Sequence, residues 1–177
     1  MRLKCITLLI GLIFNFCVSA QETMLLKDGR QLPATATWNF ISENYALTGN
    51  AKIQIAKAEK NGILKLSAET TDLNFFIGGT VYVYLSDYSV ITCTDKNIRD
   101  RKENNSIAYY SFTPSEMNIL KKTDIQSIRF NIRGNPQQFS SQIGNFTAVN
   151  KKSFFSGFGK EEKNIFETAE EIALLYK

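Results

Sequence analysis

Hydrophobic and polar residues alternate along most of the middle of this 177-residue chain. Between residues 34 and 133 the alternation has a period of two, and turn-forming Gly, Asn, Asp and Ser interrupt it at short intervals. Successive side chains of a β-strand point to opposite faces, so the pattern predicts short strands that are buried on one face. Because short turns connect antiparallel neighbours, we expect a largely antiparallel β structure.

The clearest predicted unit is a β-hairpin. Residues 52–57 alternate polar and apolar side chains, Asn61-Gly62 can adopt the positive φ angles of a tight turn, and residues 63–67 return. Two segments are predicted to be irregular, the polar stretch 96–106 and the Gly-, Asn- and Ser-rich stretch 134–159. Further strands are predicted at residues 73–77, 80–85, 89–94, 107–112 and 125–133.

The same alternation assigns side chains to the two faces of each predicted strand. The only tryptophan falls on an apolar face, so we expect it to be buried in the core. That face consists of Ala34, Ala36, Trp38 and Phe40. Two later strands combine an apolar face, formed by Val81, Val83, Leu85, Ile128, Phe130 and Ile132, with a polar face, formed by Tyr82, Tyr84, Arg129, Asn131 and Arg133.

Two helices are predicted. The residues of a capping box, Thr113 and Glu116, enclose Pro114 at the first helical position, and Met117 and Leu120 continue a helix of two to three turns. The second helix is amphipathic and is predicted over residues 160–177. Its apolar stripe consists of Ile165, Phe166, Ala169, Ile172, Ala173 and Tyr176.

Together these elements predict a mainly β fold, either a β-sandwich or a partly open barrel, with a short internal helix and a C-terminal helix laid against it. The alternative is an α+β fold in which a curved antiparallel sheet packs on the C-terminal helix. Residues 21–177 are long enough to bury one hydrophobic core, so we expect a single domain.

The stretch from Tyr109 to Arg129 (YYSFTPSEMNILKKTDIQSIR) leads from a predicted strand through the short helix into the next strand. It resembles a strand-helix-strand pattern in small exported β-rich proteins of Bacteroidetes type, which mostly lack an assigned activity. This resemblance implies an exported protein and carries no site residue with it.

Residues 1–20 have the pattern of a cleavable signal peptide. Arg2 and Lys4 precede an apolar run from Ile6 to Phe16, which is too short to anchor the chain across a bilayer, and cleavage is predicted after Ala20. We therefore expect a periplasmic or secreted protein that does not span the membrane once it is cleaved. Lipidation of Cys17 is not expected, because a lipobox requires a small residue where Phe16 stands.

Charge argues against two classes of partner. Loss of Arg2 and Lys4 would lower the basic count from 21 to 19 against 17 acidic residues, a formal charge of +2. Nucleic-acid binding and polybasic membrane-surface binding both require a strong, clustered excess of Lys and Arg, so neither is expected.

The absence of histidine excludes Ser-His-Asp and Cys-His hydrolases and the usual zinc sites. No catalytic residue, metal or cofactor is predicted. Beyond the signal peptide the one cysteine is Cys93, which shares a face with Ile91 and is expected to be buried rather than reactive.

Two other kinds of catalytic chemistry need no histidine. Paired acids serve glycosidases, and candidate pairs are Glu69 with Asp72 and Asp95 with Asp100, although turns collect aspartate for local hydrogen-bonding reasons. The Ser-Lys type requires a buried lysine, whereas the possible pair of Lys65 and Ser67 is predicted on an exposed hairpin.

The candidate binding site is the polar face that contains Tyr82, Tyr84, Arg129, Asn131 and Arg133. Arginine guanidinium groups bind carboxylates or sulfates through paired hydrogen bonds, and tyrosine offers a flat ring with a hydroxyl group. This combination suits glycans or acidic polymers if the two strands are neighbours. The alternative is a solvent-facing surface on which arginine merely covers tyrosine.

These observations lead to three hypotheses on function. The first is a non-catalytic binding or accessory module of the bacterial envelope that recognises protein or glycan. The second is a carboxylate-dependent polysaccharide hydrolase. The third is an inhibitor or immunity-like protein that acts on another exported protein.

Overall fold

The computed structural model describes residues 22–42, 49–134, 140–152 and 164–177. The predicted signal peptide, and the first residues of the predicted C-terminal helix, lie outside the described residues. The helices are α2 (Pro114–Leu120) and α3 (Thr168–Leu174). The strands are β1 (Glu22–Leu25), β2 (Gln31–Ala34), β3 (Trp38–Ser42), β4 (Asn50–Ala58), β5 (Asn61–Glu69), β6 (Phe76–Ile77), β7 (Val81–Leu85), β8 (Val90–Cys93), β9 (Arg99–Lys102), β10 (Asn105–Phe112), β11 (Ile125–Arg133) and β12 (Gly144–Val149).

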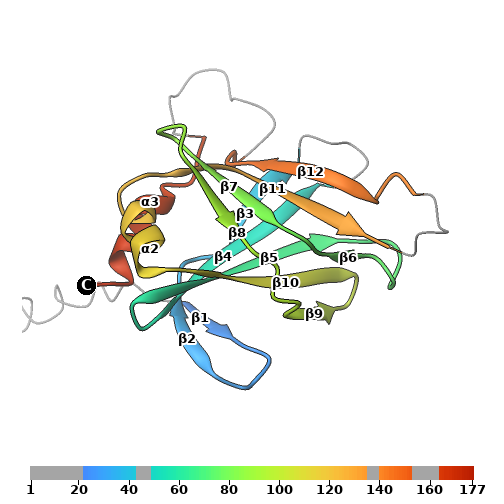
Figure 1. Cartoon of the computed structure of the whole chain (residues 1–177), viewed down its shortest axis with the longest axis horizontal. Coiled ribbons are helices and arrows are strands. Elements are labelled where there is room, and N and C mark those ends of the chain that lie inside the picture. Colours follow the sequence, from blue (N-terminus) through green and yellow to red (C-terminus); the bar gives the residue numbers. More distant parts are fainter. Residues whose placement is uncertain (1–21, 43–48, 135–139, 153–163) are drawn as a thin grey trace, which may run out of the picture.

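The twelve described strands form one antiparallel sheet, in the order β8-β7-β11-β12-β3-β4-β5-β10-β9 along its main path. The sheet curls into a half-barrel, and both helices lie at one end of it (Figure 1). The hairpin β1–β2 is joined to β4 through β2, and β6 pairs with β11. With 51% strand and 10% helix, the mainly β prediction is confirmed, and the curled sheet corresponds to its partly open form.

The concave side of the sheet holds the main hydrophobic core. Trp38 and Phe40 are fully buried there, and their rings lie 6.5 Å apart, which confirms the predicted burial of the tryptophan. Burying aromatic and branched side chains is the main favourable term for such a core. The predicted apolar faces of β7 and β11 are also confirmed, since Val81, Val83, Leu85, Ile128, Phe130 and Ile132 are all buried.

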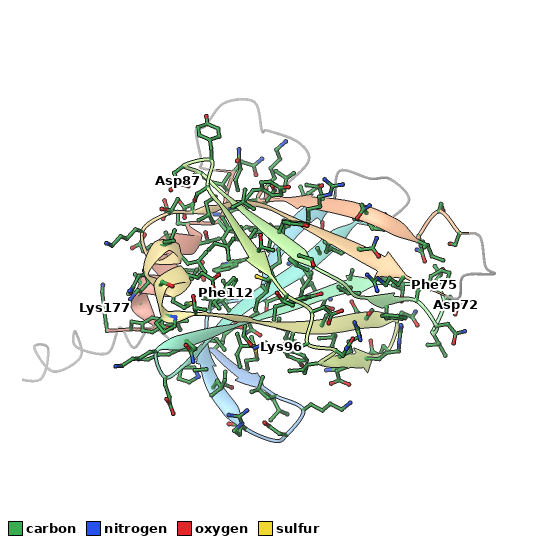
Figure 2. The ribbon with its side chains drawn as sticks, in the orientation of Figure 1. Asp72, Phe75, Asp87, Lys96, Phe112 and Lys177 are labelled. Carbon is green, nitrogen blue, oxygen red and sulfur yellow. The ribbon has the colours of Figure 1, made fainter. Side chains whose placement is uncertain are left out.

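Helix α2 begins as the sequence predicts. The Thr113 hydroxyl accepts a hydrogen bond from the Glu116 amide at 3.3 Å, and the Glu116 carboxylate accepts one from the Thr113 amide at 2.7 Å. This reciprocal pair satisfies two amides that a helix start leaves without a partner. Met117 and Leu120 then bury against the sheet, and Phe112 lies at this end of the molecule (Figure 2).

Helix α3 is shorter than predicted. Ile165 and Phe166 lie before its start at Thr168, although they fit the apolar period of the helix. Hydrogen bonds to the end of β12 explain the difference, because the Asn150 side-chain oxygen accepts from the Phe166 amide at 2.8 Å and the Lys152 amide donates to the Asn164 carbonyl. Phe166 still packs on the core, with its ring 6.0 Å from that of Phe40.

The turn of the β4–β5 hairpin differs from the prediction. Ala58 pairs with Asn61, so the turn consists of Glu59 and Lys60, and Glu59 adopts the positive φ of 57°. Gly62 is a paired residue inside β5. There it allows α2 to approach the strand, because a Cβ at this position would lie 3.0 Å from Met117 Cε and would overlap the thioether sulfur.

Two predicted irregular segments contain strands. The stretch 96–106 includes β9, an edge strand in which charged residues alternate between half-buried and exposed positions. Edge strands often carry such charges. Because β9 has no apolar face, the alternation of apolar and polar residues could not identify it. Within 134–159, β12 buries only Phe146 and Ala148, which is too weak a period to identify from sequence.

The predicted shared face of Trp38 with Ala34 and Ala36 is wrong. Residues 35–37 are not part of a strand, because the Thr35 hydroxyl and amide both bond to the backbone of Ile55 and turn the chain. Ala36 is exposed, and Ala34 belongs to a second cluster on the convex side of the sheet. The β1–β2 hairpin covers this cluster, which includes Met24, Ala34, Ala56, Ile107 and Tyr109.

Candidate functional site

Strands β7 and β11 are neighbours, so the predicted polar faces of the two strands form one surface. Tyr82 pairs directly with Arg129, and Tyr84 pairs with Ser127. Directly opposed residues in an antiparallel pair have Cβ atoms only about 5 Å apart. The condition on which the predicted site depended, proximity of the two strands, is therefore met.

This surface continues across four strands. Thr92 of β8 lies opposite Tyr82, and Thr147 of β12 lies opposite Arg129, which gives the row Thr92–Tyr82–Arg129–Thr147. Tyr82 is 39% exposed, and Arg129 is also exposed. We call the surface formed by Tyr82, Tyr84, Arg129 and Asn131 the tyrosine–arginine face.

Asn131 extends this face toward the end of β11. Its side-chain amide donates a hydrogen bond to the Asn145 side-chain oxygen of β12 at 3.3 Å. The face thus offers an aromatic ring, a guanidinium group and amide groups side by side on a rigid sheet. Such a combination can stack on a flat ring and hydrogen-bond to hydroxyl or carboxylate groups.

Arg133 lies apart from the tyrosine–arginine face. It pairs with Phe76 of β6, and its Nη2 would be 2.7 Å from a Cβ placed on Gly79. Gly79 has a φ of +83°, so this corner accepts only glycine without strain. The structure therefore brings together four of the five predicted site residues and places Arg133 beside the Gly78–Gly79 turn.

The same corner contains the carboxylate of Asp95. It accepts hydrogen bonds from the amides of Gly79 at 2.6 Å and Asn97 at 2.7 Å, and it forms an ion pair with Arg99. The Arg99 guanidinium also lies over the Phe76 ring at 4.9 Å. Asp95 is thus engaged in holding the loop between β8 and β9. Asp100 is exposed on β9 and accepts from the Arg101 amide.

Glu69 and Asp72, the other candidate acid pair, do not form a pair of facing carboxylates either. Glu69 is exposed at the end of β5, and Asp72 accepts a hydrogen bond from the Asn74 amide at 2.7 Å in the following turn. Asp72 lies at the end of the molecule farthest from the helices (Figure 2). Neither candidate pair shows the facing carboxylates of a glycosidase.

Cys93 is buried, as predicted, with 2% of its surface exposed. Burial, and secondarily the charge of Glu116, raises the pKa of its thiol to about 12. The thiolate is the reactive form of cysteine, and at neutral pH almost none is present. Cys93 therefore acts as a small apolar core residue.

A second candidate site lies on the convex side of the sheet. It is a hollow of about 300 Å³ over β4, β5, β9 and β10. We call it the lysine hollow, formed by Lys52, Gln54, Lys65, Ser67 and Lys102. The sequence analysis named Lys65 and Ser67, which share a strand face, but it did not name Lys52 and Gln54. These two residues share a face of the preceding strand with the same period of two, so that spacing is a signal by which they could have been found. Lys102 could not be found, because its strand lacks an apolar period.

In the part of the chain that the structure describes, no helix is long and apolar enough to cross a membrane. Comparisons with protein-family models, with curated proteins and with solved structures gave no match.

Proposed function

We propose that this chain is a non-catalytic binding module of the bacterial envelope, exported to the periplasm or beyond, and that it recognises its ligand on the tyrosine–arginine face. The observation that carries this proposal is the direct pairing of Tyr82 with Arg129 on an exposed sheet surface. A pleated sheet fixes the spacing of the two Cβ atoms, so the backbone under the ring and the guanidinium group needs no reordering on binding.

A glycan with acidic groups is the favoured ligand. The row Thr92–Tyr82–Arg129–Thr147 places one aromatic ring and one cation side by side between two threonine hydroxyl groups. A sugar ring can lie on tyrosine while its hydroxyl and carboxylate groups bond to threonine and arginine. Tyrosine and arginine are also enriched in protein interfaces, so a protein ligand is the second outcome that the experiment must detect.

The positions of the carboxylate groups support binding rather than hydrolysis. Asp95 is engaged by two amides and an arginine, and the lysine hollow contains a single acid, Glu103. Two acids across a cleft are required for the hydrolase hypothesis. An inhibitor or immunity-like role would be revealed by a stable complex with another exported protein.

The test is a glycan-array screen of the chain with Tyr82→Ala and Arg129→Ala variants. Matched controls are Tyr88→Ala and Arg30→Ala, which remove exposed residues of the same types elsewhere. We expect both face variants to lose about tenfold or more in affinity while both controls bind normally. Binding that survives both face substitutions would contradict the proposal.

Export is tested separately. Cell fractionation should recover the protein outside the cytoplasm, and N-terminal sequencing should begin at Gln21. A cytoplasmic protein that still begins at Met1 would contradict the envelope location.

A further inference from the structure

The lysine hollow is separated from the tyrosine–arginine face by strands β12 and β3. It lies beside the β1–β2 hairpin, on the side of the sheet that faces away from the main core. In Figure 1 this hairpin and β9 are at the bottom of the molecule, whereas β7, β11 and β12 run along the top. A ligand in the hollow would therefore not contact the tyrosine–arginine face.

Three cations from three strands line the hollow, namely Lys52 of β4, Lys65 of β5 and Lys102 of β9. Lys52 pairs with Ser67 and Lys65 pairs with Gln54, so the two lysines are diagonal neighbours on adjacent strands. Residues in this relationship are about 7–8 Å apart, close enough for both long side chains to reach one group between them.

The positive charge is not neutralised within the protein. The ion pairs among the described residues are Arg30 with Asp28 and Arg99 with Asp95, and neither involves the three lysines. Glu103 is the one acid in the lining. The lining thus combines three cations with one carboxylate, and the balance stays positive when the Glu22 carboxylate, which bonds to Gln54, is added, so the hollow favours an anion.

The floor of the hollow is polar and buried. Gln54 and Ser67 are each only 6% exposed. The Gln54 amide nitrogen donates to the Thr35 carbonyl at 3.0 Å and to the Glu22 carboxylate at 3.2 Å, which fixes its orientation. The Ser67 hydroxyl, by contrast, forms no hydrogen bond with any residue that the structure describes. The hydroxyl is not among the fully buried atoms without a partner, so it is open to the hollow and free to donate to a bound acceptor.

We propose that the lysine hollow binds a tetrahedral oxyanion, the sulfate or phosphate of a monoester whose neutral part is about the size of one sugar ring. Three lysines and one hydroxyl that is open to the hollow match an ester group with three terminal oxygens, whereas a carboxylate offers two. A hollow of about 300 Å³ has room for such a group and one ring beside it. The proposal does not depend on the function proposed for the tyrosine–arginine face.

The experiment is isothermal titration calorimetry of the full chain with glucose 6-phosphate and glucose 6-sulfate, with glucose as the uncharged probe. We expect at least one ester to bind, glucose not to bind, and high salt to weaken the binding. Lys65→Gln should weaken binding by about tenfold to a hundredfold, and Ser67→Ala by several fold. Comparison of the two esters identifies the favoured oxyanion.

The matched control is Lys122→Gln, which removes the same charge from an exposed position after α2. It should bind like the unmodified chain. Lys52→Gln, at an exposed position of β4, provides a second test if Lys65→Gln unfolds, and thermal unfolding of each variant checks its fold. The proposal is overturned if neither ester binds, if the hollow variants bind normally, or if Lys122→Gln weakens binding equally.

Discussion

Gly62 of β5 lies directly against Met117 of α2, so closely that a Cβ on the glycine would be 3.1 Å from Met117 Cγ. Met117 is completely buried, so its side chain can give way only by displacing other core residues. Gly62→Ala should therefore lower the free energy of unfolding by about 1–3 kcal/mol, the usual cost of overpacking a core. Urea unfolding followed by the fluorescence of the buried Trp38 measures the change.

Removal of the methionine side chain provides the control for this prediction. In a Met117→Ala background the added methyl group has space, so Gly62→Ala should cost much less there than in the unmodified chain. Equal costs in the two backgrounds would show that the glycine is needed for its backbone and not for the approach of α2.

The capping box of α2 gives a second prediction. Thr113→Ala removes the hydroxyl that accepts from the Glu116 amide and should destabilise the protein by about 0.5–2 kcal/mol. Thr113→Ser keeps the hydroxyl and should remain close to the original stability. If the serine variant loses as much as the alanine variant in thermal unfolding, the threonine acts through packing.

A third prediction concerns Asn150, which joins the segment before α3 to the sheet. Its amide donates to the carbonyls of Ile125 at 2.8 Å and Phe166 at 2.9 Å. Asn150→Asp removes both donors from a site that is 5% exposed and should cost about 2–4 kcal/mol. Denaturant unfolding is the measurement, and Asn118→Asp, on the exposed side of α2, is the control for the added charge.

Cys93 gives a fourth prediction, on chemical reactivity. With Cys5→Ser and Cys17→Ser present it is the only thiol, and a thiol reagent at pH 8 should label it very slowly in the folded protein. Labelling should become fast in denaturant. Rapid labelling of the folded protein would contradict the burial of this residue.

The raised pKa of Cys93 also predicts a pH dependence of stability. Its value is about 12 in the folded protein against an ordinary 9.0, so the folded state keeps a proton that the unfolded state loses. Stability should fall as the pH rises from about 9 toward 12, because the unfolded state then binds fewer protons. Cys93→Ala should show a smaller fall, which unfolding at several alkaline pH values would measure.

Sequence periodicity identified the elements in which apolar residues alternate regularly. β7 and β11 could be predicted with their faces because Val83 and Phe130 have apolar neighbours two residues away on each side. The pattern could not identify β9, because this strand consists entirely of charged residues. It also misplaced the turn of the β4–β5 hairpin, because Gly62 lies inside β5, where it allows Met117 of α2 to pack closely. Which strands become neighbours depends on long-range pairing, and no local pattern encodes it.

For the candidate sites too, the sequence predicted which residues are exposed but not which residues are neighbours. The exposed positions of Tyr82 and Arg129 follow from alternation alone, whereas their direct pairing required the sheet order. Arg133 shares that alternation but lies beside Gly79, because β6 and not β7 pairs with its end of the strand. The lysine hollow combines two hairpins that are far apart in the chain, β4–β5 and β9–β10, so it could only be found in the fold.

The pairing of Ser42 with Ala148 joins the early strand β3 to β12, the last strand among the residues that the structure describes. β3 cannot complete its pairing until β12 is available, whether the chain folds during synthesis or after export, and until then one edge of β3 has no partner. Unpaired edges with apolar side chains promote aggregation of nascent chains. Production of this protein should therefore depend on factors that shield the growing polypeptide, and shortened chains that end before β12 should accumulate as inclusion bodies.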